Sequence, residues 1–309
     1  MSCENEVAVI GMGPAGVSAA IYLKRYGMEP ICFEKGMVGG KTNFTDRIEN
    51  YPGFVGEKGS VLSSNLASQL KDFGIEPVYK SVKELSLNED GSFLLKYGKV
   101  ERNFRYVVIA NGLTDKPLHL EGEESFRRRG ISSCAICDGP LYKGKDVAVV
   151  GGGNSAFQEA NYLATICSRI YLVSHHRNLK AQEKNINTFN SFENTELLVP
   201  YEPVACTGTK SIESLVLEHN ETHERKEIRI SGLFVYIGNM PVLDYLKIEG
   251  LTNERGYITT NPSTMETKIK KLYAIGDCRD TPLRQVTTAV SDGSLAATSI
   301  HADYMDSVK

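Results

Sequence analysis

Two glycine-rich turns, about 140 residues apart, constrain the fold of this chain more than any other feature. Residues 6–16 read Glu-Val-Ala-Val-Ile-Gly-Met-Gly-Pro-Ala-Gly, so an apolar strand runs into Gly11-x-Gly13-x-x-Gly16 and then into a helix-like stretch. Residues 146–160 repeat this order with Gly151-x-Gly153-x-x-Ala156. Such turns let the backbone approach a pyrophosphate and let the helix N-terminus face the anion. The pair predicts an α/β protein with two dinucleotide-binding domains.

The residues that follow each turn distinguish the two sites. The strand after the first turn ends in Glu34, about 20 residues beyond the glycines, where an acid accepts ribose hydroxyls of FAD or NAD. The strand predicted over 169–173 is followed by Ser-His-His-Arg, with no acid. His175 and Arg177 there favour a 2′-phosphate and therefore NADPH over NADH.

A third segment completes a flavin site. The predicted strand over 271–275 ends in Gly276-Asp277, and a helix rich in small residues follows Arg284-Gln285. An aspartate at such a strand end can bind the ribityl chain, and the helix N-terminus can face the isoalloxazine carbonyl. Alone, a Gly-Asp turn after a strand is common; together with the first glycine turn it indicates flavin binding.

Cys134 and Cys137 are the only closely spaced pair among seven cysteines. At positions i and i+3 of a helical turn they can close a disulfide, and the turn lowers the pKa of a thiol there. Asp138 follows directly and can carry a proton to or from a thiolate. Half of a zinc site is the alternative, but the sequence has no second Cys-x-x-Cys pair. We therefore expect redox chemistry, no metal, and five other cysteines buried as small hydrophobic residues.

The composition is that of an ordinary globular protein. The 309 residues suit two domains, with 41% apolar and 24% charged residues. A net charge of −3 argues against nucleic-acid binding, and Arg127-Arg128-Arg129 is expected to be a solvated turn. No apolar run approaches the roughly 20 residues that cross a bilayer, and no targeting segment begins the chain. These features predict a cytoplasmic protein without membrane contact.

The chain resembles the low-molecular-weight thioredoxin reductases from residue 6 to residue 305. The shared motifs are Gly11-x-Gly13-Pro14-Ala15-Gly16, Glu49-Asn50-Tyr51-Pro52-Gly53, Cys134-Ala135-Ile136-Cys137-Asp138-Gly139, Gly151-Gly152-Gly153-Asn154-Ser155-Ala156, Tyr236-Ile237-Gly238, and Gly276-Asp277 with Arg284-Gln285. The Cys-Ala-x-Cys-Asp run before the second glycine turn is highly specific for this family.

The resemblance implies a function and two domains, the second inserted into the first. Both would be Rossmann-like with three (ββα) layers: an FAD domain over 1–114 and 245–309, and a pyridine-nucleotide-like domain over 115–244 with hinges near 112–117 and 238–244. The glycine and proline in each hinge indicate loop. The enzyme would be a homodimer that passes electrons from NADPH through FAD to thioredoxin or a thioredoxin-like protein. FAD would bind through Gly11, Gly13, Ala15, Gly16, Glu34, Asn50, Gly276, Asp277, Arg284 and Gln285, and the second nucleotide through Gly151, Gly153, Asn154, Ser155, Ala156, His175 and Arg177.

The resemblance also implies the roles of the redox residues. Cys137 would be the sulfur on the flavin side, Cys134 the one that attacks the partner disulfide, and Asp138 the acid/base.

The chain departs from the family where the 2′-phosphate should bind. The family run His-Arg-Arg-x-x-x-Arg is His-His-Arg-Asn-Leu-Lys-Ala over 175–181, so two arginines are missing. Each lost contact could remove about 1.5–3 kcal/mol of binding free energy. Three electron donors stay open: weakly bound NADPH, unselected NADH, or a redox protein such as ferredoxin. Near the flavin, Lys41-Thr42 and Asn111 also differ from the family. A nucleotide-binding redox sensor without turnover is a further alternative.

Overall fold

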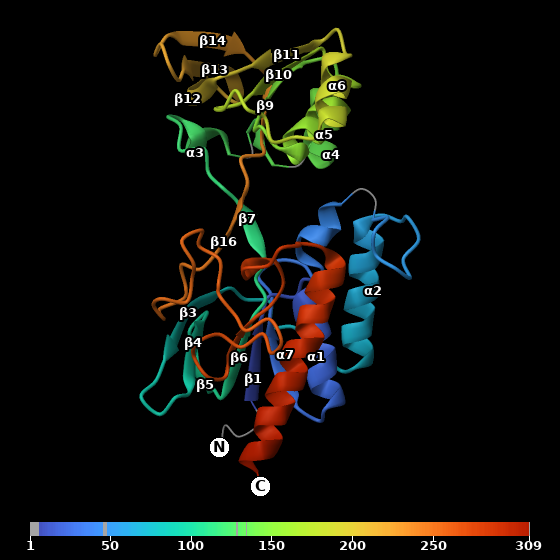
Figure 1. Cartoon of the computed structure of the whole chain (residues 1–309), viewed down its shortest axis with the longest axis vertical. Coiled ribbons are helices and arrows are strands. Elements are labelled where there is room, and N and C mark those ends of the chain that lie inside the picture. The colour runs from blue at the N-terminus through green and yellow to red at the C-terminus, as the bar shows by residue number, and fades with distance from the viewer. Residues whose placement is uncertain (1–5, 46–47, 128, 134, 309) are drawn as a thin grey trace. The chain divides into compact units, whose positions relative to one another are not determined.

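The computed structural model describes residues 6–45, 48–127, 129–133 and 135–308, and they form two compact units (Figure 1). Residues 1–114 and 240–309 make up unit 1, and residues 115–239 make up unit 2. Each unit is a mixed α/β structure built on a parallel sheet. The predicted fold class is confirmed.

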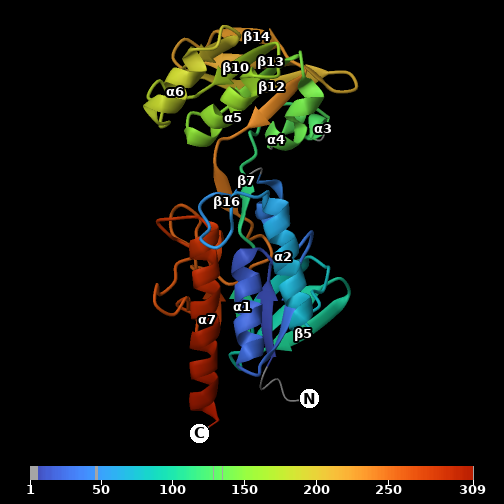
Figure 2. The same cartoon turned by 90° about the vertical axis from the view of Figure 1, so that its right-hand side faces the viewer.

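A four-stranded parallel sheet lies at the centre of unit 1, in the order β17-β6-β1-β2. Helices cover one face of this sheet, and a three-stranded antiparallel sheet, β3-β4-β5, covers the other (Figures 1 and 2). The strands and helices are β1 (Glu6–Ile10), α1 (Pro14–Arg25), β2 (Glu29–Phe33), η1 (Gly40–Phe44), α2 (Gly59–Asp72), β3 (Val82–Leu87), β4 (Phe93–Tyr97), β5 (Val100–Phe104), β6 (Tyr106–Ile109), β17 (Leu272–Ala274), η3 (Gly276–Cys278) and α7 (Val286–Ser307).

Strand β1 shows why this unit has three layers. Val7 and Val9 pack into the core beneath α1, α2 and α7, whereas Ala8 and Ile10 pack into the core beneath β3, β4 and β5. Successive side chains of a strand point to opposite faces, so a strand covered on both faces must be apolar throughout. The apolar run that precedes Gly11 therefore fixes its strand in the middle layer.

Unit 2 has the same three layers around a five-stranded parallel sheet, in the order β11-β10-β9-β15-β8. Val147 and Val149 of β9 pack against α5, and Ala148 and Val150 pack against the sheet β12-β13-β14. The elements are α3 (Glu123–Phe126), β8 (Ile131–Ser132), α4 (Ala135–Asp138), η2 (Gly139–Tyr142), β9 (Asp146–Val150), α5 (Asn154–Ala164), β10 (Arg169–Val173), α6 (Glu183–Asn190), β11 (Thr195–Leu198), β12 (Tyr201–Gly208), β13 (Ile212–His219), β14 (Arg225–Arg229) and β15 (Gly232–Val235).

The expectation that both linkers are loop is wrong. Each contains a three-residue strand, β7 (Leu113–Asp115) and β16 (Asn239–Pro241), and the two pair. Gly112 and Pro117 lie outside β7 and do not interrupt it. Pro241 is the last residue of β16, where a missing N–H is tolerated. That these linkers act as hinges stays a prediction.

Several smaller predictions can be compared with the structure. The strand predicted over 169–173 is confirmed as β10, and the small-residue helix as α7. Arg127 is about half exposed and pairs with Glu123 and Glu124, as a solvated turn requires; Arg128 lies outside the described residues. No helix within the described ranges combines the length and apolar character that crossing a bilayer requires. Four of the five other cysteines are confirmed as buried free thiols, namely Cys32, Cys167, Cys206 and Cys278, and Cys3 lies outside the described residues.

Candidate functional site

The first glycine turn, in unit 1, leaves open space at the start of α1. Gly11 has a φ of 100°, and a Cβ there would lie 2.5 Å from the Ala110 carbonyl oxygen, so no side chain fits. Gly13 is the N-cap of α1 and has no side chain to cap the helix. A Cβ added there would meet nothing within 4 Å. The first N–H groups of a helix lack partners within the helix. The turn therefore offers donors and room for a pyrophosphate.

Glu34 lies at the end of β2, beside this turn. Its Oε2 accepts a hydrogen bond from the Met12 N–H at 2.8 Å, and its Oε1 accepts one from the Gly36 N–H at 2.7 Å. The side chain is buried but lines a pocket of about 350 Å³ together with Gly11, Asn111 and others. An ionised carboxylate has about four lone-pair sites, so roughly two remain for ribose hydroxyls. These residues fit the adenosine half of FAD.

Asn111, one of the residues that differ from the family, also lines this pocket and makes two hydrogen bonds there. Its Nδ2 donates to the Val242 carbonyl oxygen at 2.7 Å, and the Tyr245 hydroxyl donates to its Oδ1 at 3.3 Å. Asn111 therefore ties the end of β6 to the segment that closes the pocket. Sequence reasoning missed Tyr245, because no local pattern marks a residue that reaches across 134 positions.

The residues predicted for the flavin end gather at the N-terminus of α7. The Asn50 Nδ2 donates to the Gln285 Oε1 at 2.8 Å, and the Arg284 Nε donates to the Asp277 carbonyl oxygen at 3.4 Å. Burial raises the pKa of the Asp277 carboxyl, while Arg284 and Lys41 act in the opposite direction. Lys41, which the family lacks at this position, therefore adds positive charge near Asp277.

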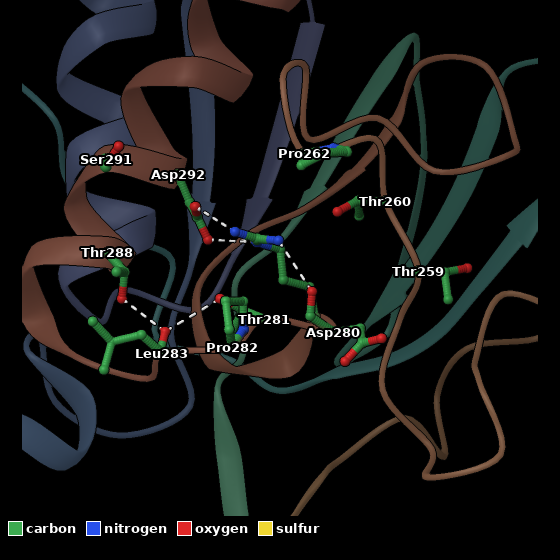
Figure 3. A pocket seen from close by; sticks show the side chains of 11 residues that line it. Thr259, Thr260, Pro262, Asp280, Thr281, Pro282, Leu283, Thr288, Ser291 and Asp292 are labelled. Carbon is green, nitrogen blue, oxygen red and sulfur yellow. Dashed lines mark hydrogen bonds and ion pairs between the residues drawn. The ribbon is translucent and has the colours of Figure 1, made fainter.

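A buried ion pair that the sequence did not suggest holds this turn. Asp292, on α7, accepts from the Arg279 Nε at 2.6 Å and Nη2 at 2.9 Å, and from the Gly276 N–H at 2.9 Å. Asp292 points from α7 toward a pocket of about 500 Å³ that Thr281 and Leu283 also line (Figure 3). The pair fixes the turn that carries Asp277 against the helix whose N-terminus lies beside it.

The second glycine turn, in unit 2, repeats the geometry of the first. Gly151 has a φ of 148°, and a Cβ there would lie 2.4 Å from the Tyr236 carbonyl oxygen. Gly153 is the N-cap of α5, and a Cβ there would meet nothing within 4 Å. The Asn154 Oδ1 accepts from the Gln182 N–H at 2.7 Å, so this side chain anchors the loop after β10. The turn is again open to a pyrophosphate.

Two acids reach the end of β10, where the sequence places none. The Arg177 Nε and Nη2 donate to the two carboxylate oxygens of Glu221 at 3.1 and 2.9 Å. The His175 Nδ1 lies 3.1 Å from the Glu202 Oε2 and 2.9 Å from the Asn220 Nδ2. Two carboxylates, from Glu202 and Glu221, therefore lie at this site although the local sequence after β10 contains no acid.

The redox segment is described in part. Cys134 lies outside the described residues, and so does the side chain of Cys137, whose backbone belongs to the helical turn α4. The Ala135 N–H donates to the Tyr236 hydroxyl at 2.8 Å, which fixes the start of that turn. The Ser132 hydroxyl donates to the Asp138 Oδ2 at 2.6 Å. Among the described residues, no group of three or more His, Cys, Asp or Glu side chains is placed to hold a metal.

Comparison with known proteins decides the family. The profile of the pyridine nucleotide-disulphide oxidoreductases matches residues 5–293. A thioredoxin reductase of Bacillus subtilis is 37% identical over 305 residues, covering 96% of this chain and 93% of the relative. The chain belongs to the thioredoxin reductase family. The predicted resemblance is confirmed.

Two solved structures of the thioredoxin reductase family extend this result. A crystal structure of Lactococcus lactis thioredoxin reductase, described as the FR conformation, superposes with a TM-score of 0.87 at 34% identity, covering 98% of this chain and 99% of the other. A ferredoxin-flavin thioredoxin reductase from Clostridium acetobutylicum superposes with a TM-score of 0.54 at 31% identity, covering 97% and 98%. Family membership makes the chain a flavoprotein oxidoreductase of the disulfide reductase class.

Thioredoxin reductase motifs gather at three places within the two units. In unit 1, the first glycine turn with Glu34 forms one end of the site, and the start of α7 with Asp277 forms the other. In unit 2, the second glycine turn adjoins the end of β10, because the Gly151 N–H donates to the Val173 carbonyl oxygen at 2.9 Å. Asp138 lies in α4, the turn that follows Cys134 in the chain, and α4 contacts α5.

Proposed function

We propose that this chain reduces the disulfide of thioredoxin or a thioredoxin-like protein with electrons from a reduced nicotinamide nucleotide. The observation that carries the proposal is the presence of two open dinucleotide turns in separate units, with the Cys-x-x-Cys pair in the unit that has the second. A chain that only binds nucleotide needs neither the second turn nor the pair.

Unit 1 would hold FAD, which would supply the acceptor for the nicotinamide hydride that the side chains of the polypeptide lack. The donors at the start of α1 would bind the pyrophosphate, and Glu34 would accept ribose hydroxyls. Asp277 would bind the ribityl chain, and the N-terminus of α7 would face the isoalloxazine ring. Arg284 stacks over the Tyr257 ring, 4.1 Å from its centroid, which restricts the guanidinium beside this end of the site.

The cysteine pair would carry out the exchange with thioredoxin. The Cys134 thiolate attacks one sulfur of the thioredoxin disulfide and displaces the other as a thiolate, which takes up a proton. The Cys137 thiolate then attacks the mixed disulfide at Cys134 and releases the second thioredoxin thiolate. Thioredoxin gains two electrons, and the pair is left oxidised. Asp138, beside Cys137 in the chain, is the proposed proton carrier.

The family resemblance also supports two proposals about the state of the enzyme. We expect a homodimer and a cytoplasmic location. Light scattering on the purified FAD-loaded protein tests the first, because a monomer at micromolar concentration would contradict it. Fractionation of the native cells tests the second.

Anaerobic mixing tests the central proposal. The FAD-loaded protein is mixed with NADH or NADPH, the flavin absorbance is followed, and oxidised thioredoxin is then added. We expect the nucleotide to bleach the flavin and thioredoxin to restore its colour. A flavin that neither nucleotide bleaches at millimolar concentration contradicts a nicotinamide donor and favours a redox protein. A bleached flavin that thioredoxin leaves unchanged contradicts the proposed acceptor.

A further inference from the structure

Two carboxylates from distant parts of unit 2 meet the residues that follow β10. Glu221 lies in the turn between β13 and β14, 44 positions from Arg177, and Glu202 lies on β12, 27 positions from His175. Asn220 adds a third contact, because its Nδ2 donates to the His175 carbonyl oxygen at 2.7 Å. The hairpin turn therefore lies against the His-His-Arg segment.

This place is the adenosine side of the second dinucleotide turn. A Cβ on Gly152 would lie 2.6 Å from the Ser174 hydroxyl, and the Lys180 N–H donates to the Gly152 carbonyl oxygen at 2.8 Å. The glycine turn and the segment after β10 are therefore in direct contact. In this type of fold the residues at the end of the second strand meet the ribose 2′ position.

Glu221 already makes the contact that a 2′-phosphate would make. A guanidinium binds a carboxylate or a phosphate through two parallel N–H donors, and here Nε and Nη2 both go to Glu221. Both side chains are more than half exposed, so the pair adds little to stability. The pair instead lowers the affinity for a 2′-phosphate. A phosphate must displace Glu221 from Arg177, and it then remains near the negative charges of Glu221 and Glu202.

We propose that Glu221 determines the nucleotide specificity of this site. It holds Arg177 away from a 2′-phosphate, so the site favours a nucleotide with a free 2′-hydroxyl, and NADH over NADPH. The carboxylates also supply the hydroxyl acceptor that the local sequence after β10 lacks. This inference rests on the proposed function only in taking unit 2 as the nicotinamide nucleotide site.

Calorimetry on the full-length FAD-loaded protein tests the proposal without turnover. The probes are 5′-AMP and adenosine 2′,5′-bisphosphate, which differ only in the 2′-phosphate. We expect the wild-type protein to bind 5′-AMP at least as tightly as the bisphosphate. In Glu221→Gln the bisphosphate should bind roughly tenfold more tightly, because the guanidinium is released to a phosphate, while 5′-AMP changes less than about threefold.

Two further variants serve as controls. Glu224→Gln makes the same change of charge in the same hairpin turn and keeps the ion pair of Arg177 with Glu221; it should leave the ratio of the two affinities near the wild-type value. Glu221→Gln combined with Arg177→Gln should lose the gain for the bisphosphate. If Glu224→Gln gives the same gain as Glu221→Gln, the effect is net charge alone and the proposal is wrong.

Two other outcomes separate the inference from the function beneath it. If Glu221→Gln leaves the ratio unchanged while both probes bind, Glu221 is not a specificity determinant and the proposed function stands. If neither probe binds any variant at millimolar concentration, unit 2 is not a nucleotide site, which contradicts both the inference and the nicotinamide donor.

Discussion

Asp292 accepts hydrogen bonds from the Nε and Nη2 atoms of Arg279 at 2.6 and 2.9 Å, and both side chains are buried. The same carboxylate accepts the Gly276 N–H. One aspartate of α7 thus fixes the turn that presents Asp277 to the proposed flavin site. A buried ion pair with further hydrogen bonds tolerates the loss of one partner poorly, because the other charge is left without compensation.

We therefore predict that Asp292→Ala lowers the free energy of unfolding by about 3–5 kcal/mol. Urea denaturation of the FAD-free protein, followed by circular dichroism, measures the change. Lys270→Ala removes the exposed pair of Lys270 with Glu266 and should cost less than about 1 kcal/mol. A loss of under 1 kcal/mol in Asp292→Ala would show that the buried pair does not hold the turn.

Glu34→Gln should weaken FAD binding. The amide replaces one acceptor oxygen with a donor, so a contact with the Met12 N–H, the Gly36 N–H or a ribose hydroxyl is lost. We expect the dissociation constant of FAD to rise roughly tenfold to a hundredfold, measured by flavin fluorescence during reconstitution of the FAD-free protein. Glu29→Gln changes an exposed acid of the same strand that pairs with Lys24, and should leave FAD affinity unchanged. Equal affinities in the two variants would remove Glu34 from the site.

Glu159, on α5, makes the stability of the folded protein depend on pH. Its Oε2 is buried without a partner among the described residues, and burial raises the pKa of its carboxyl. A raised pKa in the folded state means that the folded chain binds the proton more tightly, so stability is lost as pH rises through that pKa. We expect Glu159→Gln to gain stability relative to wild type as pH rises above 4.5, the ordinary pKa of a glutamate carboxyl.

Urea denaturation of both proteins from pH 4 to pH 7 measures the difference in the free energy of unfolding. Taking the difference at each pH cancels any constant effect of the amide. Glu224→Gln, an exposed acid of the same unit, is the control and should show no such trend. A difference that stays flat from pH 4 to pH 7 would mean that the carboxyl ionises in the folded state without cost.

Asp138→Asn should slow the reduction of thioredoxin and leave bleaching of the flavin by the nucleotide unchanged. The amide cannot carry a proton, and positioned acid/base groups contribute about 10²- to 10⁴-fold to rates. Stopped-flow absorbance separates the two half-reactions. Ser132→Ala removes the hydrogen bond to the Asp138 Oδ2 but keeps the carboxyl, so it should change the rate only a few-fold. A variant Asp138→Asn that retains more than half the wild-type rate would exclude this role.

Individual strands and turns were predictable from the sequence because neighbouring residues determine their conformation. The apolar run before Gly11 and the strand over 169–173 are examples, since burial on both faces leaves a continuous apolar segment. Contacts between distant polar residues were not predictable. The partner of Arg177 lies 44 positions away on a half-exposed hairpin, where an acid carries no periodic signal. Asp292 likewise stands inside a long helix, where nothing local marks it as buried and paired.

The most direct test concerns Cys134 and Cys137, and it is the appearance of free thiols on thioredoxin. FAD-loaded wild type, Cys134→Ser and Cys137→Ser are each mixed anaerobically with NADH or NADPH and oxidised thioredoxin, and new thiols are counted. We expect two thiols per thioredoxin from the wild type and none above background from Cys134→Ser. Cys137→Ser should stop at the mixed disulfide and release no more than one thioredoxin thiol per enzyme. The nucleotide should still bleach the flavin in all three. Undiminished thiol release from Cys134→Ser would contradict disulfide exchange through this pair.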